Sequence, residues 1–488
     1  MKRALERHRT LFSSSPRGGK KIERRQGLRW LVDAALPLAL TFVVAAIAFA
    51  VDGLDANGRW VLFACAEATV LWSTTRIDAA YVALGAALLL VLVGAVPAET
   101  LHDSLASDVV WLMIGAFIVG GALRDTGVTT RLTRVLLARA RTVAGAAFWL
   151  TTAIVPLAFI IPSTSARAAM LLPIYEDLAS ALRDRRGRRA FALLVPSVIL
   201  ISTVGSLVAA GSHLISEQLL EQATGETIGY LRWLAWGAPF AVVTSALTAA
   251  AVVFAFLPRS LRWRPLSLPA PEEGKIDGAG WTTIAVVAVM VVLWLTTSIH
   301  HLDVSIVTLL GAILLTVPKG GVITWSQGLK AVSWSLVLFV GAALVLGEAL
   351  IDSGVGTFLL DKLLPRGPGV GAQAPILFGA LLALSTVTAH LYMPSHAARA
   401  AAFVPPLLHL ASSADLNPLA VVFFANLGLD YCLTFPISSK ALLVYQQLDR
   451  ETFDAADLMR LSALLMPLYA LAMLAFYFAY WRWTGAAF

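Results

Sequence analysis

The sequence predicts an all-α polytopic membrane protein built from an inverted repeat, with about eleven transmembrane helices and two re-entrant hairpins. Three observations predict this. Of the 488 residues, 58% are hydrophobic and only 14% are charged, which is too apolar for a soluble domain. The apolar runs are continuous rather than alternating, which indicates helices and excludes a β-barrel. One motif with a central arginine occurs twice, each time inside membrane-grade sequence.

The repeated motif runs from Ile160 to Pro173 as IIPSTSARAAMLLP, and again from Tyr392 to Pro405 as YMPSHAARAAAFVP. Both copies keep two prolines, a serine, an arginine and three alanines at matching positions. An arginine near the middle of a membrane segment costs a few kcal/mol or more. Its presence at the same place twice therefore indicates a functional site.

The chain carries more apolar spans than simple crossings can use. Crossings are expected at 29–51, 59–74, 79–96, 108–124, 190–215, 233–257, 279–298, 303–317, 334–351, 417–445 and 460–481. The remaining spans form two pairs, 144–161 with 163–180, and 374–391 with 395–412. Only Pro162 joins the first pair, and only Tyr392 to Pro394 join the second. Consecutive crossings need a polar turn at the membrane surface, so each pair is expected to form a re-entrant hairpin, 144–180 and 374–412.

The distribution of basic residues predicts the orientation. Most arginine and lysine clusters fall on alternate sides of the crossings, which places the basic tail 1–28 in the cytoplasm. The acidic loop from 217 to 226 then lies outside, and the protein is expected in the inner (plasma) membrane. Lys362 and Arg366 are exceptions, because the count places them outside as well. The net charge of +7 comes mostly from cytoplasmic loops and does not indicate nucleic-acid binding.

The repeat extends beyond the motif and divides the chain. Trp111 to Leu132 recurs as Trp334 to Leu359, and a hairpin follows each copy. One repeat has an odd number of crossings, so the second copy is inverted and the two hairpin tips meet near the midplane. The expected parts are scaffold helices at 29–107, a first repeat at 108–257 with a broken helix at 190–215, a linker at 258–278, and a second repeat at 279–488 with a broken helix at 417–445.

The chemistry of the motif favours an anion. Ser163 and Ser395 each follow a proline and open a helix, where a hydroxyl caps free backbone N–H groups. Such a helix end attracts carboxylate, sulfate or phosphate oxygens. Arg167 and Arg399 stand four residues later on the same face, where the helix dipole disfavours a cation. An anion between helix end and guanidinium relieves both penalties, and an arginine can grip a carboxylate with two hydrogen bonds.

Several intramembrane polar residues have a structural interpretation beside the functional one. Each arginine could pair with a fixed acid, such as Glu176 or Asp177 near the first tip, or reach the cytoplasmic surface. His396 is expected to be a substrate or proton site, whereas His213 and Lys440 are equally compatible with a structural role. The remaining residues of this kind are Glu67, Glu348, His390 and Asp430, and a structural pair of Lys440 with Asp430 accounts for those two residues equally well.

The chain resembles the divalent anion/sodium symporter family, the dicarboxylate and citrate carriers of the larger ion-transporter superfamily, over nearly its whole length. Members of that family carry Ser-Asn-Thr at each hairpin tip and a Thr-Pro-Pro-Asn-like stretch in each broken helix. The corresponding residues here are Ser163, Thr164 and Ser165; Ser395, His396 and Ala397; Gly211, Ser212 and His213; and Ser438, Ser439 and Lys440. The resemblance implies an elevator mechanism, a homodimer built on the scaffold, and substrate carboxylates held by the two tips.

The main departure from this family concerns sodium. The tip asparagines that help to coordinate sodium in the family are replaced here by Thr164 and His396. Fixed positive charge from Arg167 and Arg399 stands where the family recruits mobile cations. The sequence therefore predicts no cofactor and no metal site, apart from a possible residual sodium site near Thr164 and Gly211.

These observations predict a secondary transporter of small organic dianions, such as di- and tricarboxylates, that works by sodium-independent exchange. The alternative is a sodium- or proton-coupled importer of carboxylates or of an inorganic oxyanion such as sulfate. An anion channel is a third class. An intramembrane enzyme is not expected, because no serine has a base at a convincing spacing.

Overall fold

The computed structural model describes residues 35–182, 184–266, 268, 276–356, 358, 375–448 and 451–488. Within these ranges the regular structure is helical, with one isolated β-bridge between Thr142 and Pro265. The predicted tail 1–28, and the exceptions Lys362 and Arg366, lie outside the described residues.

The first half of the chain opens with a helix at Ala35–Ala50. Its scaffold and first-repeat helices are α3 (Ala56–Thr74), α4 (Ala79–Leu92), α5 (Ala98–Leu105), α6 (Asp108–Asp125) and α7 (Val128–Leu137). The first hairpin and broken helix follow as α8 (Val143–Leu157), α9 (Thr164–Ala181), α10 (Arg185–Ile201), the 3-10 turns η1 (Ser202–Gly205) and η2 (Leu207–Ala209), and α11 (Gly211–Thr224). The half ends with α12 (Tyr230–Phe256).

The second half repeats this order. After α13 (Arg259–Arg262) come α14 (Gly278–Leu295), α15 (Thr297–His300), α16 (Val304–Thr316), α17 (Trp325–Ala331) and α18 (Trp334–Asp352). The second hairpin and broken helix are α20 (Pro375–Thr388), η3 (Ala389–Leu391), α21 (His396–Ser413), α22 (Pro418–Leu429), η4 (Pro436–Ser438) and α23 (Lys440–Gln446). The chain closes with α24 (Ala455–Ala479) and η5 (Trp481–Trp483).

Each predicted crossing coincides with a helix or a pair of helices. Among the described residues, six helical stretches are long and apolar enough to span a membrane, and further apolar helices are shorter. The six are Ala98–Asp125, Arg185–Gly205, Tyr230–Phe256, Gly278–Leu295, Trp334–Asp352 and Ala455–Trp483. The short helices α5 and α17, which lead into α6 and α18, were not predicted. They are too polar and too brief to appear as spans.

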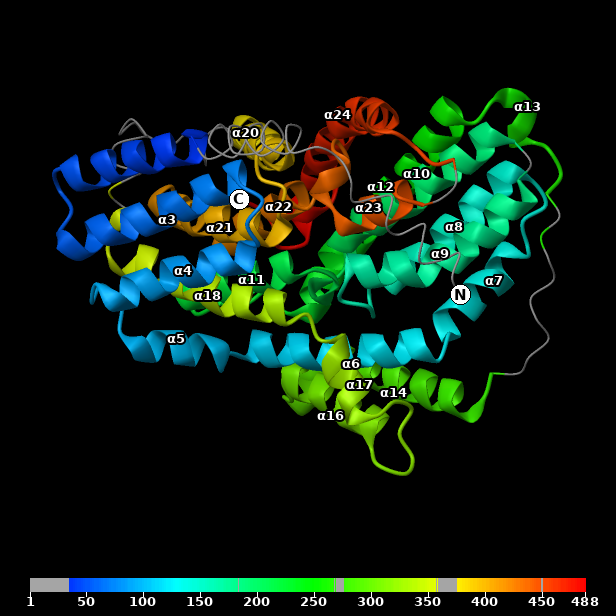
Figure 1. Cartoon of the computed structure of the whole chain (residues 1–488), viewed down its shortest axis with the longest axis horizontal. Coiled ribbons are helices and arrows are strands. Elements are labelled where there is room, and N and C mark those ends of the chain that lie inside the picture. Colours follow the sequence, from blue (N-terminus) through cyan, green and yellow to red (C-terminus); the bar gives the residue numbers. More distant parts are fainter. Residues whose placement is uncertain are drawn as a thin grey trace, which may run out of the picture.

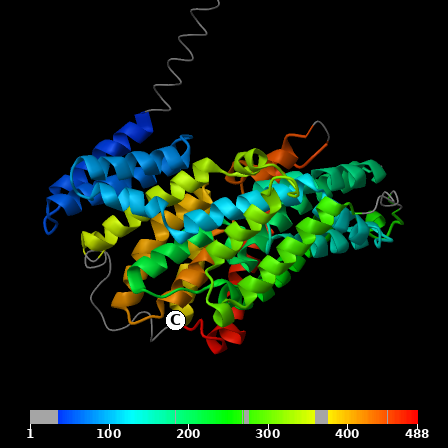
Figure 2. The same cartoon turned by 90° about the horizontal axis from the view of Figure 1, so that it is seen from below.

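Helices from the two halves of the chain pack against each other in matching pairs, which reveals the internal symmetry. Helix α4 packs against α18 of the other repeat, and its counterpart α16 packs against α6. Likewise, α5 lies against α18 and α17 lies against α6. Figures 1 and 2 show these helices side by side in both views. Since each of these contacts has a counterpart with the repeats interchanged, the arrangement agrees with the repeat expected from the sequence.

One predicted boundary was wrong. The stretch from 217 to 226 was expected to be an acidic external loop, but α11 continues to Thr224. The helix ends only at Gly225, whose φ of 73° is the left-handed conformation that favours glycine at a helix C-terminus. The predicted linker 258–278 contains α13, and its Pro265 forms the isolated bridge with Thr142, the residue before α8.

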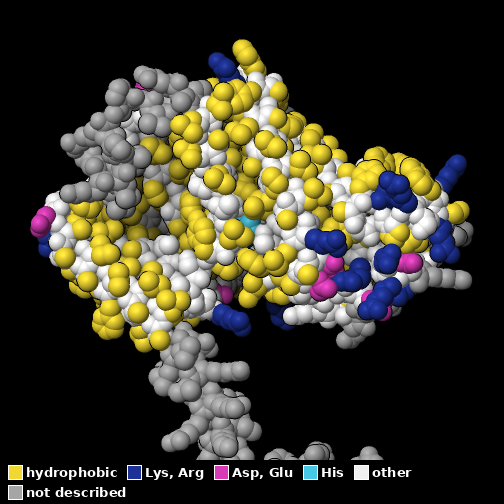
Figure 3. Space-filling view, turned by 90° about the horizontal axis from the view of Figure 1, so that it is seen from above, with side chains coloured by type: hydrophobic (Ala, Val, Ile, Leu, Met, Phe, Trp, Pro, Cys, Tyr) yellow, Lys and Arg dark blue, Asp and Glu magenta, His cyan; other side chains and the backbone are white. Residues whose placement is uncertain are grey.

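The surface supports membrane embedding. Hydrophobic side chains dominate the face in Figure 3, and Lys and Arg gather toward one end. Ion pairs join the start of α10 to the start of α24 and the residues before it: Arg185 and Arg188 with Glu451, and Arg189 with Asp454 and Asp457. Such separation of an apolar belt from a charged end is typical of a polytopic membrane protein.

Candidate functional site

The predicted serine caps are present at both hairpin tips. Ser163 Oγ accepts a hydrogen bond from the backbone N–H of Ala166, and Ser395 Oγ accepts one from that of Ala398, each at 3.2 Å. Both serines have extended backbone and precede the first residue of a helix, as an N-cap requires. The caps were therefore predicted correctly. Thr164 and Ser165 open α9, and His396 and Ala397 open α21.

Each hairpin is seated between the two broken helices. Helix α9 packs against α10 and also against α23 from the other repeat, whereas α21 packs against α22 and against α11. The Tyr445 hydroxyl donates a hydrogen bond of 3.1 Å to the carbonyl of Ala168, which fixes α23 to the first hairpin. The structure thus brings all four predicted site elements together, although they are far apart in the sequence.

Glycine permits two of the close approaches in this region. A Cβ on Gly237 of α12 would collide with the carbonyl of Val204 in the first break. A Cβ on Gly428 of α22 would collide with the Thr386 side chain and approach the backbone of Val387 in α20. Because these glycines lack a side chain, α12 can approach the backbone of the first break and α22 can approach the second hairpin closely.

Arg167 is bound by the first break rather than by an acid. Its guanidinium is fully buried and donates to the carbonyl of Ile199 at 3.2 Å, to Thr203 Oγ1 at 3.0 Å and to the carbonyl of Ala209 at 3.4 Å. The suggested pairing with Asp177 is wrong, because that carboxylate binds Arg134 at 2.9 Å. Arg167 therefore holds the hairpin tip to the unwound part of the broken helix.

Arg399 is buried as deeply but has far fewer partners. Its Nη1 donates to the carbonyl of Met393 at 3.3 Å. Its Nε and Nη2 have no hydrogen-bond partner among the described residues. The Cys432 thiol, a weak acceptor, interacts with the same guanidinium, and the Asp430 carboxylate acts on it electrostatically. Nε and Nη2 form one edge of the guanidinium, the edge that binds a carboxylate through two parallel hydrogen bonds.

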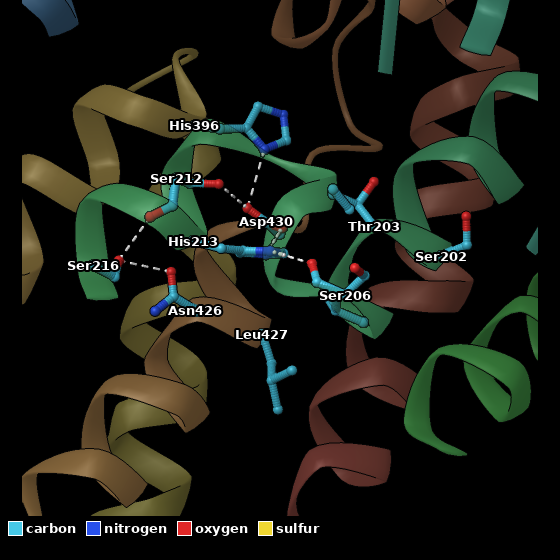
Figure 4. A network of polar contacts seen from close by, with 12 residues as sticks. Ser202, Thr203, Ser206, Ser212, His213, Ser216, His396, Asn426, Leu427 and Asp430 are labelled. Atoms are coloured by element: carbon cyan, nitrogen blue, oxygen red, sulfur yellow. Dashed lines mark hydrogen bonds and ion pairs between the residues drawn. The ribbon is translucent and has the colours of Figure 1, made fainter. Parts of the chain in front are cut away.

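A buried polar network joins the two broken helices to the second tip (Figure 4). Asp430, directly after α22, accepts hydrogen bonds from Ser212 Oγ at 2.8 Å and from His396 Nδ1 at 3.4 Å. Its other oxygen lies 2.5 Å from His213 Nε2. Ser216 Oγ lies 2.9 Å from Asn426 Oδ1 and adds a second link between α11 and α22. The alternative pair of Lys440 with Asp430 is not formed, since Asp430 is engaged by the two histidines.

The remaining predicted residues lie at the second break. Ser439 caps α23 by accepting from the backbone N–H of Ala441, while Ser438 is buried and its hydroxyl has no partner among the described residues. Lys440 is the first residue of α23 and its side chain is exposed. Gly211 begins α11 against the Leu336 side chain. The break thus supplies an unpaired hydroxyl, as the sequence suggested, but not a buried lysine.

Three other intramembrane polar residues lie apart from the network or at its edge. Glu67 accepts from Thr41 at 2.7 Å, which links α3 to the helix at 35–50. Glu348 lies on α18 near Asp352 and Asp103. His390 bonds to the carbonyl of Val387 and lies 2.6 Å from Thr434 Oγ1. Glu67 and His390 therefore have ordinary structural hydrogen-bond partners.

Some residues of the site were not anticipated. Thr203, Ser206, Ser216 and Asn426 complete the hydrogen bonds of the arginine and the network, and Cys432 interacts with both His396 and Arg399. The sequence signal that could have identified these residues is that polar side chains occur inside the apolar spans 190–215 and 417–445. Ser216 and Asn426 lie 210 residues apart, and Thr203 lies 36 residues from Arg167, so no local pattern could pair them.

Comparisons with known proteins agree with this architecture. The profile of the citrate transporter family (CitMHS) matches residues 69–426. A membrane protein of Cupriavidus necator is 26% identical, covering 94% of this chain and 93% of its own. The sodium-dependent dicarboxylate transporter SdcS of Staphylococcus saprophyticus is 21% identical, covering 82% of each chain.

A solved structure shares the fold. The crystal structure of the YdaH transporter of Alcanivorax borkumensis superposes with a TM-score of 0.52, covering 88% of this chain and 99% of that one, at 13% identity. The repeated tips, the two broken helices and the family profile lead to one assignment: the chain is a membrane transporter that belongs to the citrate transporter family, within the divalent anion/sodium symporter group that the sequence resembles.

Proposed function

We propose that this protein transports small organic dianions, di- or tricarboxylates, by sodium-independent exchange. The observation that carries the proposal is the unpaired edge of Arg399. A buried guanidinium with two unsatisfied donors is costly, because each loses its hydration without a replacement. A substrate carboxylate restores both hydrogen bonds at once. Since Arg399 is fully buried, the tip of the second hairpin opens to admit the substrate.

The charges of the site match a doubly charged substrate. Arg167 and Arg399 contribute two fixed positive charges. The Asp430 carboxylate is engaged by Ser212, His213 and His396 and forms no hydrogen bond with either arginine among the described residues. A dianion therefore neutralises the site. An empty site must carry unpaired charge through a region of low dielectric constant, which costs several kcal/mol, so the loaded carrier crosses and the empty one rarely does.

Sodium does not fit the first break. The staphylococcal relatives are sodium-dependent transporters by name, and sodium in such folds binds to carbonyls of unwound helices. Here the carbonyls of Ile199 and Ala209 already accept from Arg167, and that of Ser206 faces His213.

We propose an elevator mechanism in a homodimer, as the family resemblance implies. Tyr445 ties α23 to α9, and Asp430 ties α22 to α11 and α21. These hydrogen bonds join the hairpins and broken helices to one another, as a moving unit requires, and we assign the helices of 29–107 to the scaffold. We place this protein in the inner membrane with the N-terminus in the cytoplasm, as the charge distribution predicts.

Binding to the purified protein tests the substrate class. Isothermal titration with succinate, citrate, sulfate and phosphate, in sodium-free buffer, is expected to detect the carboxylates and to show weaker binding of the inorganic ions. Arg399→Lys keeps the charge but removes the two-point contact, and should weaken carboxylate binding. Arg134→Lys, at an exposed ion pair, is the matched control. Tighter binding of sulfate would move the assignment to an oxyanion transporter, and no binding of any anion would refute the proposal.

A further inference from the structure

We propose that the arginines at the start of α8 and in the linker 258–278 bind the phosphate headgroup of an anionic phospholipid. The inference goes beyond the proposed function, because it concerns neither the substrate nor the hairpin tips. The site lies at the end of the molecule where α7 and α13 lie against α8 (Figure 1). We place this end at the cytoplasmic surface of the membrane, as the charge distribution predicts.

A backbone bridge holds two arginines on one face. Two hydrogen bonds flank the antiparallel bridge between Thr142 and Pro265, and the carbonyls of Arg141 and Arg264 accept them at 3.1 and 3.2 Å. Side chains alternate along extended backbone, so the residues next to the bridged pair share the opposite face. Arg141 and Arg264 are diagonal neighbours on that face, and such neighbours lie about 7 to 8 Å apart. Both residues are exposed, and one phosphate group can reach both guanidinium groups.

No carboxylate among the described residues forms an ion pair with Arg141 or Arg264. By contrast, Arg185, Arg188 and Arg189 at the start of α10 each pair with an acid at or before the start of α24. Like charges that face each other across paired strands are destabilising. An anion between the two arginines removes that repulsion.

Two more arginines enlarge the positive surface. Arg139 stands two residues before Arg141, and its guanidinium lies 5.5 Å from the centre of the Trp149 ring. Arg259 opens α13 and is exposed. Arg262 is not available, because it donates to three carbonyls at the end of α12. The basic patch therefore consists of Arg139, Arg141, Arg259 and Arg264.

The surroundings of the basic patch favour a lipid over a soluble anion. Helix α12 is long and apolar enough to span the membrane, and α13 begins three residues after its end. Trp263 and Phe254 beside the patch are 76% and 68% exposed, and exposed aromatic rings of this kind mark the membrane interface. Basic clusters directly beyond a transmembrane helix bind anionic headgroups, and arginine grips a phosphate with two hydrogen bonds. Acyl chains of the same molecule can pack on the aromatic rings.

Thermal unfolding with added lipid tests the site. Purified full-length protein in neutral detergent is mixed with phosphatidylglycerol or with zwitterionic phosphatidylcholine. We expect phosphatidylglycerol to raise the unfolding midpoint by about 2 °C or more above its value in phosphatidylcholine. Arg141→Gln combined with Arg264→Gln should lose most of this difference. The matched control is Arg124→Gln combined with Arg185→Gln, which removes the same charge from two arginines that pair with acids, and it should keep the difference.

Native mass spectrometry gives a second measurement that does not depend on stability. From an equimolar mixture of the two lipids, wild type should retain phosphatidylglycerol with a preference of about tenfold, the size expected from two arginines at an anionic membrane surface. Arg141→Gln with Arg264→Gln should reduce this preference, and the control variant should not.

Three results would overturn the inference. Wild type without a preference for phosphatidylglycerol would show that no anionic lipid is bound. An equal loss in the two double variants would show that overall charge, rather than the basic patch, attracts the lipid. A midpoint that inorganic phosphate raises as much as phosphatidylglycerol does would show a site for a soluble anion. Neither experiment uses a dicarboxylate, so this inference and the proposed function can fail separately.

Discussion

Arg167 and Arg399 occupy the same position of the repeated motif, yet only Arg167 is held by the protein on several sides. Its terminal nitrogens donate to two backbone carbonyls and a threonine hydroxyl, whereas Arg399 donates to one carbonyl and keeps one edge unpaired. The duplicated sequence has thus produced one structural cation and one cation available to a ligand.

Replacing Arg399 should impair binding more than folding. In Arg399→Gln, loss of a buried two-point charged contact is expected to cost about 2 to 5 kcal/mol, or tens to thousands of times in affinity for a dicarboxylate. The measurement is titration calorimetry on monodisperse protein. If Arg399→Gln binds succinate and citrate as wild type does, the unpaired edge is not the substrate contact.

Replacing Arg167 should impair folding first. Arg167→Met removes the guanidinium donor of the Ala209 carbonyl and the contacts to the Ile199 carbonyl and Thr203, and a buried carbonyl left unpaired costs roughly 1 to 3 kcal/mol. Thermal unfolding in detergent, without any ligand, is expected to show a lower midpoint for Arg167→Met than for Arg399→Met. An equal or smaller loss in Arg167→Met would mean that the first break does not depend on its arginine.

The close contact between the second hairpin and its broken helix can be tested by adding one methyl group. Gly428→Ala is expected to push α22 away from Thr386 and to cost about 1 to 3 kcal/mol of stability, as overpacking does. Gly85→Ala, on α4, is the matched control, because no atom lies within 4 Å of the added carbon. Equal stability of both variants would refute the close packing of these helices.

Low pH should weaken the charged cluster at the start of α24. The hydrogen bond from the backbone N–H of Asp457, and then the nearby Arg189, lower the pKa of Asp454. A carboxyl group whose pKa is lowered by folding stabilises the folded state at pH values above its pKa in the unfolded chain, about 3.9. This stabilisation is lost as the pH falls through the lower pKa of the folded state. The difference in unfolding midpoint between wild type and Asp454→Ala should be constant from about pH 8 to 5 and shrink below about pH 4. A difference that grows with acid would contradict this assignment.

The sequence was sufficient for the architecture because its signals are local. Continuous apolar runs, short proline-containing linkers and a motif written twice predict the helices, the hairpins and the caps of Ser163 and Ser395. It was not sufficient for the partners of the charged residues. Arg167 reaches an unwound segment instead of Asp177, and Asp430 binds His213 instead of Lys440. Such pairs depend on how the broken helices cross, which periodicity does not report.

One measurement tests both the exchange of dianions and its independence of sodium. Labelled succinate or citrate uptake is followed in proteoliposomes, with and without unlabelled dianion inside, in sodium and in choline buffers. We expect rapid uptake only into loaded vesicles, at the same rate in both buffers, because the two buried arginines hinder return of the empty carrier. Strong uptake into empty vesicles, driven by an inward sodium gradient, would contradict the claim.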